Sequence, residues 1–269
     1  MALQQTYELP LTPQPIIGHA ELELSDGQRT TIHYAQYART AFQAQVVTFT
    51  EATPLLEWCR ENSYHDAING GFFLRSIGQP LGELHVQGQP LPFVPFDSDH
   101  GPRRGSIHVD AEGNIQLGPR HVLPETPEGD LLQAGPLLLH DNDVTHRSLR
   151  SDPEKFSQTA HQHDADITAE RYPRAAIGCN GQYIWTISAD GRHPKDAGLY
   201  LHELAGFMKS LGVESALNLD GGSSSTHISA GQLLNKPRTD YEESSEGFPI
   251  YNAIVFTPRT TPPQPQLVK

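Results

Sequence analysis

The sequence predicts an α+β fold: a single domain on a mixed, mainly antiparallel sheet, with two or more helices and long loops. Three observations lead to this prediction. Many short stretches alternate apolar and polar residues as strands do, whereas only two stretches have clear helical spacing. The 269 residues include 22 prolines and 23 glycines, which imply many turns. No repeat period is present, so one domain is expected.

Composition shifts set the expected boundaries of this domain. Residues 1–18 are rich in Gln and Pro and are expected to form an extended N-terminal arm. Residues 19–257 contain all the periodic segments and form the predicted domain. Residues 258–269 are a Pro-rich C-terminal tail.

The N-terminal half is expected to be mostly strands with one helix. Thr53-Pro54 predicts an N-cap and first helical position for a helix over Leu55–Glu61. Short strands separated by Gly/Pro turns are expected between residues 80 and 120, and two apolar runs flank Gly135-Pro136. Other strands are expected at Glu21–Leu24, Thr31–Tyr34, Gln45–Phe49 and the start of Ala67–Phe73.

The C-terminal half begins with a polar, His-rich segment, Asp141–Tyr172, of a length typical of binding loops, lids or disordered stretches. Asn180-Gly181 between two alternating runs then predicts a β-hairpin. A helix capped by Asp196 is expected to end at Gly212 in a left-handed turn. Its apolar stripe is Tyr200, Leu204, Phe207, Met208 and Leu211, and strands are expected at Arg174–Cys179, Tyr183–Ser188, Ser215–Leu219 and Ile250–Phe256.

Charge and composition narrow the possible partners and location. The net charge of −13 argues against broad nucleic-acid binding, which needs a cationic surface. No stretch approaches the 18 apolar residues of a membrane span. The N-terminus shows no signal sequence, so a cytoplasmic location is expected, with secretion left open. Cys59 and Cys179 are expected to be buried free thiols rather than a disulfide.

The segment Ala216–Ser225, ALNLDGGSSS, is the most informative part of the chain. An apolar strand that buries Leu217 and Leu219 would hold Asp220 on a rigid element. Glycines after it allow backbone N–H groups to approach a ligand closely. A plain Gly-Gly turn is the alternative for this segment taken alone. Its candidate ligand-binding residues are Asn218, Gly221, Gly222, Ser223 and Ser224; Asn218 could instead satisfy local backbone groups.

Further candidates lie in other segments. Asn69 and Gly70 form a turn before two aromatics, of which Phe73 is a candidate sugar platform. Arg174 opens a buried-looking strand, so its head group needs a partner or a ligand. Asp190 and Arg192 occur in an Asp-Gly-Arg turn that could equally be structural. Glu83 is the best candidate for a second carboxylate, although a surface strand position is as plausible.

A cluster of His and Asp at residues 161–166, HQHDAD, raises a metal hypothesis. Imidazole and carboxylate are compatible metal ligands, and alternate residues of an extended strand share one face. Asp164 and Asp166 are therefore candidate ligands of a divalent cation. A solvated polar loop is the more common meaning of such a cluster, and the two acids could instead orient Arg174.

Four segments in order resemble the phosphodiester glycosidase family: AINGGFF at 67–73, YPRAAIG at 172–178, DGR at 190–192 with the helix after it, and ALNLDGGSSS at 216–225. Asn235 and Asn252 match the closing elements of the family. The resemblance covers residues 65–256 and implies a mixed α/β domain with these motifs around one cleft. Two departures are present: Ser223 stands where a third glycine is usual and would be strained at positive φ, and the usual arginine before the last strand is missing, with Arg238 nearest.

The resemblance implies a hydrolase that releases a sugar from a sugar-1-phosphodiester or a related glycosidic linkage. Cleavage at the anomeric carbon needs cations or N–H dipoles on the departing phosphate and a carboxylate for the developing positive charge or the water. Arg174 and Arg192 suit the first task and Asp220 the second, with Asp190 and Glu83 as further catalytic candidates. The substrate-binding candidates are Asn69, Gly70, Phe73, Arg174, Arg192, Asn218, Gly221, Gly222, Ser223, Ser224 and Asn235.

Two other functions remain open at this stage. One is a metal-dependent phosphoesterase in which Asp220, Asp164 and Asp166 hold a divalent cation; the leading hypothesis requires no cofactor. The other is a non-catalytic carbohydrate-binding domain. A serine nucleophile is not expected, since no G-x-S-x-G elbow is present. The expected partner is a small phosphosugar or glycan; the oligomeric state, the sugar and the stereochemical outcome are left open.

Overall fold

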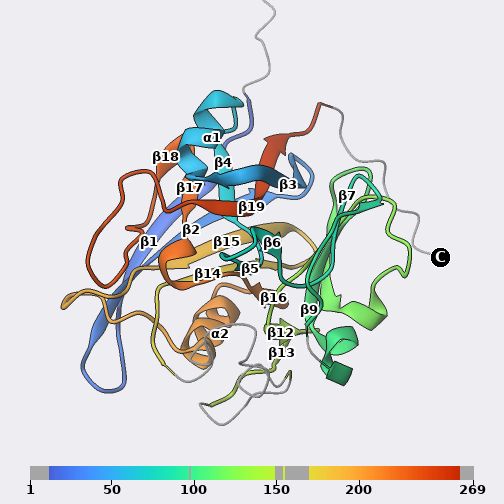
Figure 1. Cartoon of the computed structure of the whole chain (residues 1–269). Coiled ribbons are helices and arrows are strands. Elements are labelled where there is room, and N and C mark those ends of the chain that lie inside the picture. Colours follow the sequence, from blue (N-terminus) through green and yellow to red (C-terminus); the bar gives the residue numbers. More distant parts are fainter. Residues whose placement is uncertain (1–11, 97, 149–153, 155–169, 261–269) are drawn as a thin grey trace, which may run out of the picture.

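The computed structural model shown in Figure 1 describes residues 12–96, 98–148, 154 and 170–260. Its described part is mostly β-structure, with nineteen strands and only two α-helices, α1 (Leu55–Glu61) and α2 (Leu201–Ser210). The predicted α+β class is therefore wrong, and the fold is β-rich. Many strands contain only two to four residues, too few to show a period of two, so the sequence underestimates the strand content.

The first of three large sheets in the described part has seven strands in the order β1-β2-β15-β14-β16-β12-β13, and all its pairings are antiparallel. Its centre is the hairpin of β14 and β15, in which Cys179 pairs with Ile184 across Asn180-Gly181, which confirms that prediction. The strands are β1 (Ile16–Glu23), β2 (Arg29–Ala38), β12 (Leu137–His140), β13 (Asp143–Val144), β14 (Arg174–Cys179), β15 (Tyr183–Ala189) and β16 (Ser215–Asn218).

The other two sheets have five strands each. The second sheet, in the order β18-β17-β4-β19-β3, contains β3 (Phe42–Thr53), β4 (Asp66–Asn69), β17 (His227–Ser229), β18 (Gln232–Leu233) and β19 (Ile250–Pro258). The third, in the order β10-β9-β11-β7-β8, contains β7 (Leu84–Val86), β8 (Gln89–Pro90), β9 (Gly105–Val109), β10 (Ile115–Pro119) and β11 (Asp130–Gln133). β5 (Phe73–Leu74) and β6 (Gln79–Pro80) form a small separate hairpin.

One hydrophobic core is shared by all three sheets. Ile177 and Leu217 of the first sheet, Phe256 of the second and Ile107 of the third belong to the same buried cluster. Each helix covers an outer face: α2 lies on the first sheet through β12, β13 and β16, and α1 lies on the second through β4 (Figure 1). Leu219 also lies in the shared core, so the chain that leads to Asp220 is anchored as predicted.

Several boundaries differ from those the sequence indicates. Pro54 is the N-cap of α1 rather than its first residue. Helix α2 begins at Leu201, and Asp196 does not cap it; the Asp196 carboxylate instead accepts hydrogen bonds from Thr31 and Arg238. Strand β1 starts within the predicted arm, and β19 ends one residue inside the predicted tail.

Two smaller expectations concern the thiols and the membrane. Cys59 and Cys179 are both free and buried, as predicted, and burial raises the pKa of Cys59 to about 12 and that of Cys179 to about 11. Among the described residues, neither helix is long and apolar enough to span a bilayer.

Candidate active site

A hollow of about 730 Å³ brings the main predicted site segments together. Asp220, Arg174 and Arg192 all line it. The other lining residues are Phe72, Phe73, Leu74, Arg75, Ser76, Tyr172, Gly221, Gly222, Ser223, Ser224, Thr239, Asp240, Tyr241 and Glu242.

Asp220 is held through its backbone at the end of the β16 segment. Its N–H donates to the carbonyl of Gly70 at 3.0 Å, and its own carbonyl accepts from Nδ2 of Asn69 at 2.7 Å. Leu219 before it is fully buried, while Asp220 is half-buried and reaches the hollow. Because the main chain is fixed on both sides of the residue, the carboxylate starts from a defined position.

The Asn69-Gly70 turn serves this positioning rather than lining the hollow. Asn69 is buried and also accepts at Oδ1 from the N–H of Thr226 at 3.0 Å. A Cβ at Gly70 would lie 2.0 Å from Oδ1 of Asn252, which accepts from the N–H of Gly71. Glycine is therefore required here for close backbone approach. Both predicted residues bind the backbone of Asp220 and lie outside the hollow.

The glycine turn after Asp220 borders the hollow. Gly222 takes the left-handed conformation with φ of 61°, so the expected strain at Ser223 is absent. The N–H of Gly222 donates to the carbonyl of Pro173 at 2.8 Å. Within the described residues, the N–H groups of Gly221 and Ser223 make no hydrogen bond, which leaves two donors for an anion. Ser224 lies in the short 3₁₀ turn η5 (Gly222–Ser224) that follows.

Arg174 forms the buried floor of the site. Its side chain is 1% exposed, and Nε and Nη2 donate to the carbonyls of Leu199 and Glu170 at 2.8 and 2.7 Å. Burial lowers its pKa to about 10, still far above neutrality. Among the described residues no carboxylate forms an ion pair with Arg174.

Arg192 approaches the same turn from the strand end after β15. It has a left-handed backbone, with φ of 56°, an unusual conformation for a residue other than glycine. Its guanidinium carbon lies 5.4 Å from the centre of the Tyr172 ring, and its Nη2 would be 3.3 Å from a Cβ on Gly222. The carboxylate of Asp240 lies 3.2 Å from its Nε.

Glu83, predicted as a second catalytic carboxylate, does not line the hollow. Arg120 binds both of its carboxylate oxygens, at 2.7 and 2.9 Å, and His85 contacts it at 2.9 Å. Burial raises the pKa of Glu83, but the hydrogen bonds and charge of Arg120 outweigh it and lower the pKa overall. Glu83 therefore takes part in an ion pair with Arg120 beside the third sheet, which favours a structural role.

Asp190 is also placed away from the hollow, in the interior. It is 1% exposed; one carboxylate oxygen accepts from the N–H of Lys236 at 2.8 Å, and the other lies 3.1 Å from Nε2 of His33. These partners tie β2, the end of β15 and the loop after β18 together. The arrangement favours the structural alternative for Asp190.

Two predicted substrate-binding amides are internal as well. Asn218 is fully buried and donates to the carbonyls of Gly135 and Leu219. Asn235 is 3% exposed; it accepts from the N–H of His227 and donates to the carbonyl of Ser225. Both satisfy backbone groups behind the site and neither lines it.

The metal hypothesis rests on residues that the structure leaves undescribed. Asp164 and Asp166 lie outside the described ranges. Within those ranges, no three His, Cys, Asp or Glu side chains are grouped as metal ligands. The divalent cation therefore stays a prediction.

Sequence reasoning missed several lining residues. Arg75, in the β5–β6 hairpin, donates to Oγ of Ser223 at 2.9 Å and adds a third guanidinium to the hollow. Asp240 and Tyr241 come from a loop about twenty residues after the glycine turn. A single charged residue in a loop carries no periodic signal, so only the fold reveals them.

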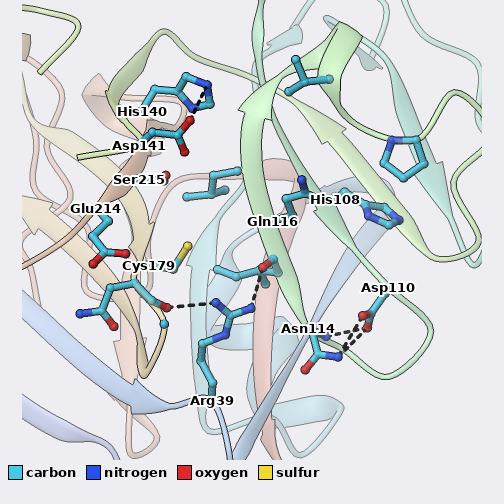
Figure 2. Close-up of a pocket in the computed structure, with 16 residues that line it drawn as sticks. Arg39, His108, Asp110, Asn114, Gln116, His140, Asp141, Cys179, Glu214 and Ser215 are labelled. Atoms are coloured by element: carbon cyan, nitrogen blue, oxygen red, sulfur yellow. Dashed lines mark hydrogen bonds and ion pairs between the residues drawn. The ribbon is translucent and has the colours of Figure 1, made fainter. Parts of the chain in front are cut away.

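A second hollow, of about 650 Å³, lies beside β10 and contains none of the predicted site residues (Figure 2). Its guanidinium, Arg39, is occupied by the carbonyls of Asn180 and Ile115. Its acid Asp110 is bound by Asn114, and Asp141 is largely exposed. Charged groups that already have partners, or lie in solvent, make this hollow the weaker candidate.

Comparison with known proteins gives a family match. The family model described as phosphodiester glycosidase matches residues 62–257. N-acetylglucosamine-1-phosphodiester alpha-N-acetylglucosaminidase from mouse is 28% identical over 213 residues, and the human protein is 26% identical. Each alignment covers 73% of this chain but 38% of the relative, so the chain spans about two fifths of the length of these curated relatives.

Solved structures share the fold. A hypothetical protein from Synechocystis aligns with a TM-score of 0.69 and 18% identity, over 91% of this chain and 62% of that one. The catalytic domain of zebrafish N-acetylglucosamine-1-phosphodiester alpha-N-acetylglucosaminidase, auto-inhibited by its pro-peptide, also aligns with a TM-score of 0.69 at 17% identity, over 93% of this chain and 86% of that one.

Proposed function

Because the chain belongs to the phosphodiester glycosidase family, we propose that it hydrolyses the glycosidic bond of a sugar-1-phosphodiester. The relatives are named for N-acetylglucosamine-1-phosphodiester, and that sugar is the first to test. One observation carries the proposal: an acid, Asp220, and two arginines, Arg174 and Arg192, line a single hollow.

The proposed reaction breaks the bond between the anomeric carbon and the bridging oxygen. Water supplies the new oxygen on the sugar and loses a proton, and the phosphate departs with the bridging oxygen as a monoester. A phosphomonoester is a good leaving group, so protonation of the bridging oxygen contributes less than in an ordinary glycoside. Stabilising the negative charge on the departing phosphate becomes the main requirement.

The cationic side of the hollow suits that requirement. Arg174 is desolvated, so its attraction to a phosphate is weakly screened by water. Arg192 and the N–H groups of Gly221 and Ser223 supply further donors around the same turn. Guanidinium groups match phosphate oxygens in geometry, which supports placing the phosphate between Arg174 and this turn.

Asp220 is assigned the other half of the chemistry. An ionised carboxylate stabilises the positive charge that develops on the anomeric carbon and can orient the attacking water. The assignment rests on its position: the backbone is fixed by Asn69 and Gly70, and the residue lines the hollow. Phe73 lines the same hollow and offers an apolar surface for the sugar ring.

The decisive experiment follows the bond that breaks. A panel of sugar-1-phosphodiesters, led by an N-acetylglucosamine-1-phosphodiester, is incubated in water enriched in ¹⁸O, with and without EDTA. The proposal predicts free sugar with ¹⁸O at the anomeric hydroxyl and an unlabelled phosphomonoester. Label in the phosphate would show phosphoesterase chemistry instead, and binding without turnover across the panel would indicate a carbohydrate-binding domain. Activity abolished by EDTA and restored by a divalent cation would establish the metal.

A further inference from the structure

One guanidinium of the hollow already faces a carboxylate of the same chain. Oδ1 of Asp240 lies 3.2 Å from Nε of Arg192, and both residues line the hollow. We propose that Asp240 is a specificity-determining residue: it occupies the anion position of Arg192 in the free protein, and a substrate phosphate must displace it. This inference rests on the proposed function, because it assumes that a phosphate binds at Arg192.

The segment that carries Asp240 is an ordered turn with its own supports. At its base, Arg238 pairs with Glu243 at 2.7 Å and with Asp196 at 3.2 Å. At its tip, Oγ1 of Thr239 accepts from the N–H groups of residues 241 and 242. Arg238, the arginine nearest to the missing family position, therefore fixes the rim and does not line the hollow.

The contact between Asp240 and Arg192 is built so that another anion can replace it. The Asp240 side chain is 69% exposed, against 23% for Arg192. Although the two groups are close, the buried Nε of Arg192 makes no hydrogen bond within the described part of the chain. An exposed, misaligned ion pair contributes little stability, whereas a phosphate oxygen accepting from Nε would satisfy a buried donor.

Arg192 itself stays in place when Asp240 leaves. Its Nη1 donates to the carbonyl of Arg238 at 3.2 Å, and its guanidinium lies over the ring of Tyr172. Displacement therefore moves a solvated carboxylate and leaves the cation where the phosphate needs it. A neutral ligand gains nothing by displacing Asp240, so the contact discriminates in favour of anions that bind Arg192 more strongly than a carboxylate does.

The test measures binding of inorganic phosphate by isothermal titration calorimetry at one fixed ionic strength. Asp240→Asn removes the competing charge in a similar shape. Glu242→Gln is the matched control, because Glu242 lines the same hollow from the same turn and, unlike Asp240, forms no ion pair with Arg192 among the described residues. Asp240→Asn is expected to bind phosphate about fivefold tighter, and Glu242→Gln within about twofold of wild type.

A second arm ties the effect to Arg192 and to catalysis. Adding Arg192→Gln to Asp240→Asn should abolish the gain in phosphate affinity. With a hydrolysed phosphodiester, Asp240→Asn should lower KM by about the same factor and leave kcat within about twofold. Equal affinity in the Asp240 and Glu242 variants, or weaker binding in Asp240→Asn, would overturn the inference alone. Absence of phosphate binding in wild type and all variants would overturn both the inference and the phosphate site of the proposed function.

Discussion

Two strand ends carry nearly the same motif, and the fold uses them in opposite ways. Asp190-Gly191-Arg192 follows β15, and Asp220-Gly221-Gly222 follows the β16 segment. At the first, the carboxylate is 1% exposed and has protein partners, while the arginine two residues later lines the hollow. At the second, the backbone of Asp220 is fixed and the residue is half-buried and lines the hollow.

The comparison shows that an Asp-Gly turn alone does not distinguish a reacting acid from a structural one. What distinguishes them is exposure and place. The Asp190 carboxylate is buried against His33 and the N–H of Lys236, whereas Asp220 is half-buried and lines the hollow. A reacting group needs a rigid backbone and access to the substrate, and of the two acids only Asp220 has both.

The largest expected effect is on turnover at the second strand end. Asp220→Asn keeps the shape and removes the charge, so kcat/KM on the phosphodiester should fall about 1,000-fold or more. Stability should change by about 1 kcal/mol or less, because the Asn69 and Gly70 bonds involve only the backbone of residue 220. Steady-state kinetics and urea unfolding measure the two effects. A large loss of stability with little loss of turnover would reverse the assignment.

The first strand end should show the opposite result. Asp190→Asn replaces an oxygen that faces Nε2 of His33 with an amide that donates, and it removes a buried charge that holds Lys236 N–H. Unfolding free energy should fall by about 2 to 3 kcal/mol, while kcat per folded molecule stays within about threefold of wild type. If turnover collapsed without a loss of stability, Asp190 would be catalytic, as the sequence allows.

The sequence predicts those parts of the molecule whose cause is local. Helix α1, the hairpin at Asn180-Gly181 and the strand that buries Leu217 each follow from spacing or turn chemistry within a few residues. The grouping of Asp220 with Arg174 also comes from the sequence, through the family motifs. Their strands β14 and β16 are neighbours in the first sheet.

What the sequence misses depends on partners far along the chain. Asp196 does not cap α2 because Thr31 and Arg238 bind its carboxylate. Glu83 lies outside the hollow, and Arg120, 37 residues away, binds both of its oxygens. Short strands such as β5 and β6 leave no periodic pattern. Tertiary contacts of this kind override local preference, and no window of sequence contains them.

The acid sensitivity of the protein should come from the interior around the first strand end. His227 is fully buried between the hydroxyls of Thr186 and Ser188, and burial lowers its pKa to about 3 from 6.5. As the pH falls, His227 takes up a proton near pH 6.5 in the unfolded chain but only near pH 3 in the folded chain. Protonation therefore favours the unfolded state, so the free energy of unfolding declines as the pH falls from 6.5 toward 3 and is unaffected by His227 above pH 6.5. The slope for one histidine is at most about 1.4 kcal/mol per pH unit.

Urea unfolding at pH 7.5, 6 and 5 measures that slope. His227→Gln cannot titrate and should flatten this slope between pH 6.5 and 5. Because His227 does not line the hollow of Asp220, the variant and the wild type should show the same dependence of substrate KM on pH. An unchanged slope in His227→Gln would assign the acid sensitivity to other groups.

The smallest expected effect separates backbone strain from a functional contact at the second strand end. Gly222 and Gly212 both have left-handed backbones, with φ of 61° and 81°. A Cβ at Gly212 meets nothing within 4 Å, whereas one at Gly222 lies 3.3 Å from Nη2 of Arg192. Alanine at either position should therefore cost about 1 kcal/mol of stability, but only Gly222→Ala should displace the guanidinium and raise KM for the phosphodiester, by about threefold to tenfold. Equal KM values in the two variants would mean that the turn holds Asp220 without setting the position of Arg192, and the two strand ends would then act on the substrate independently.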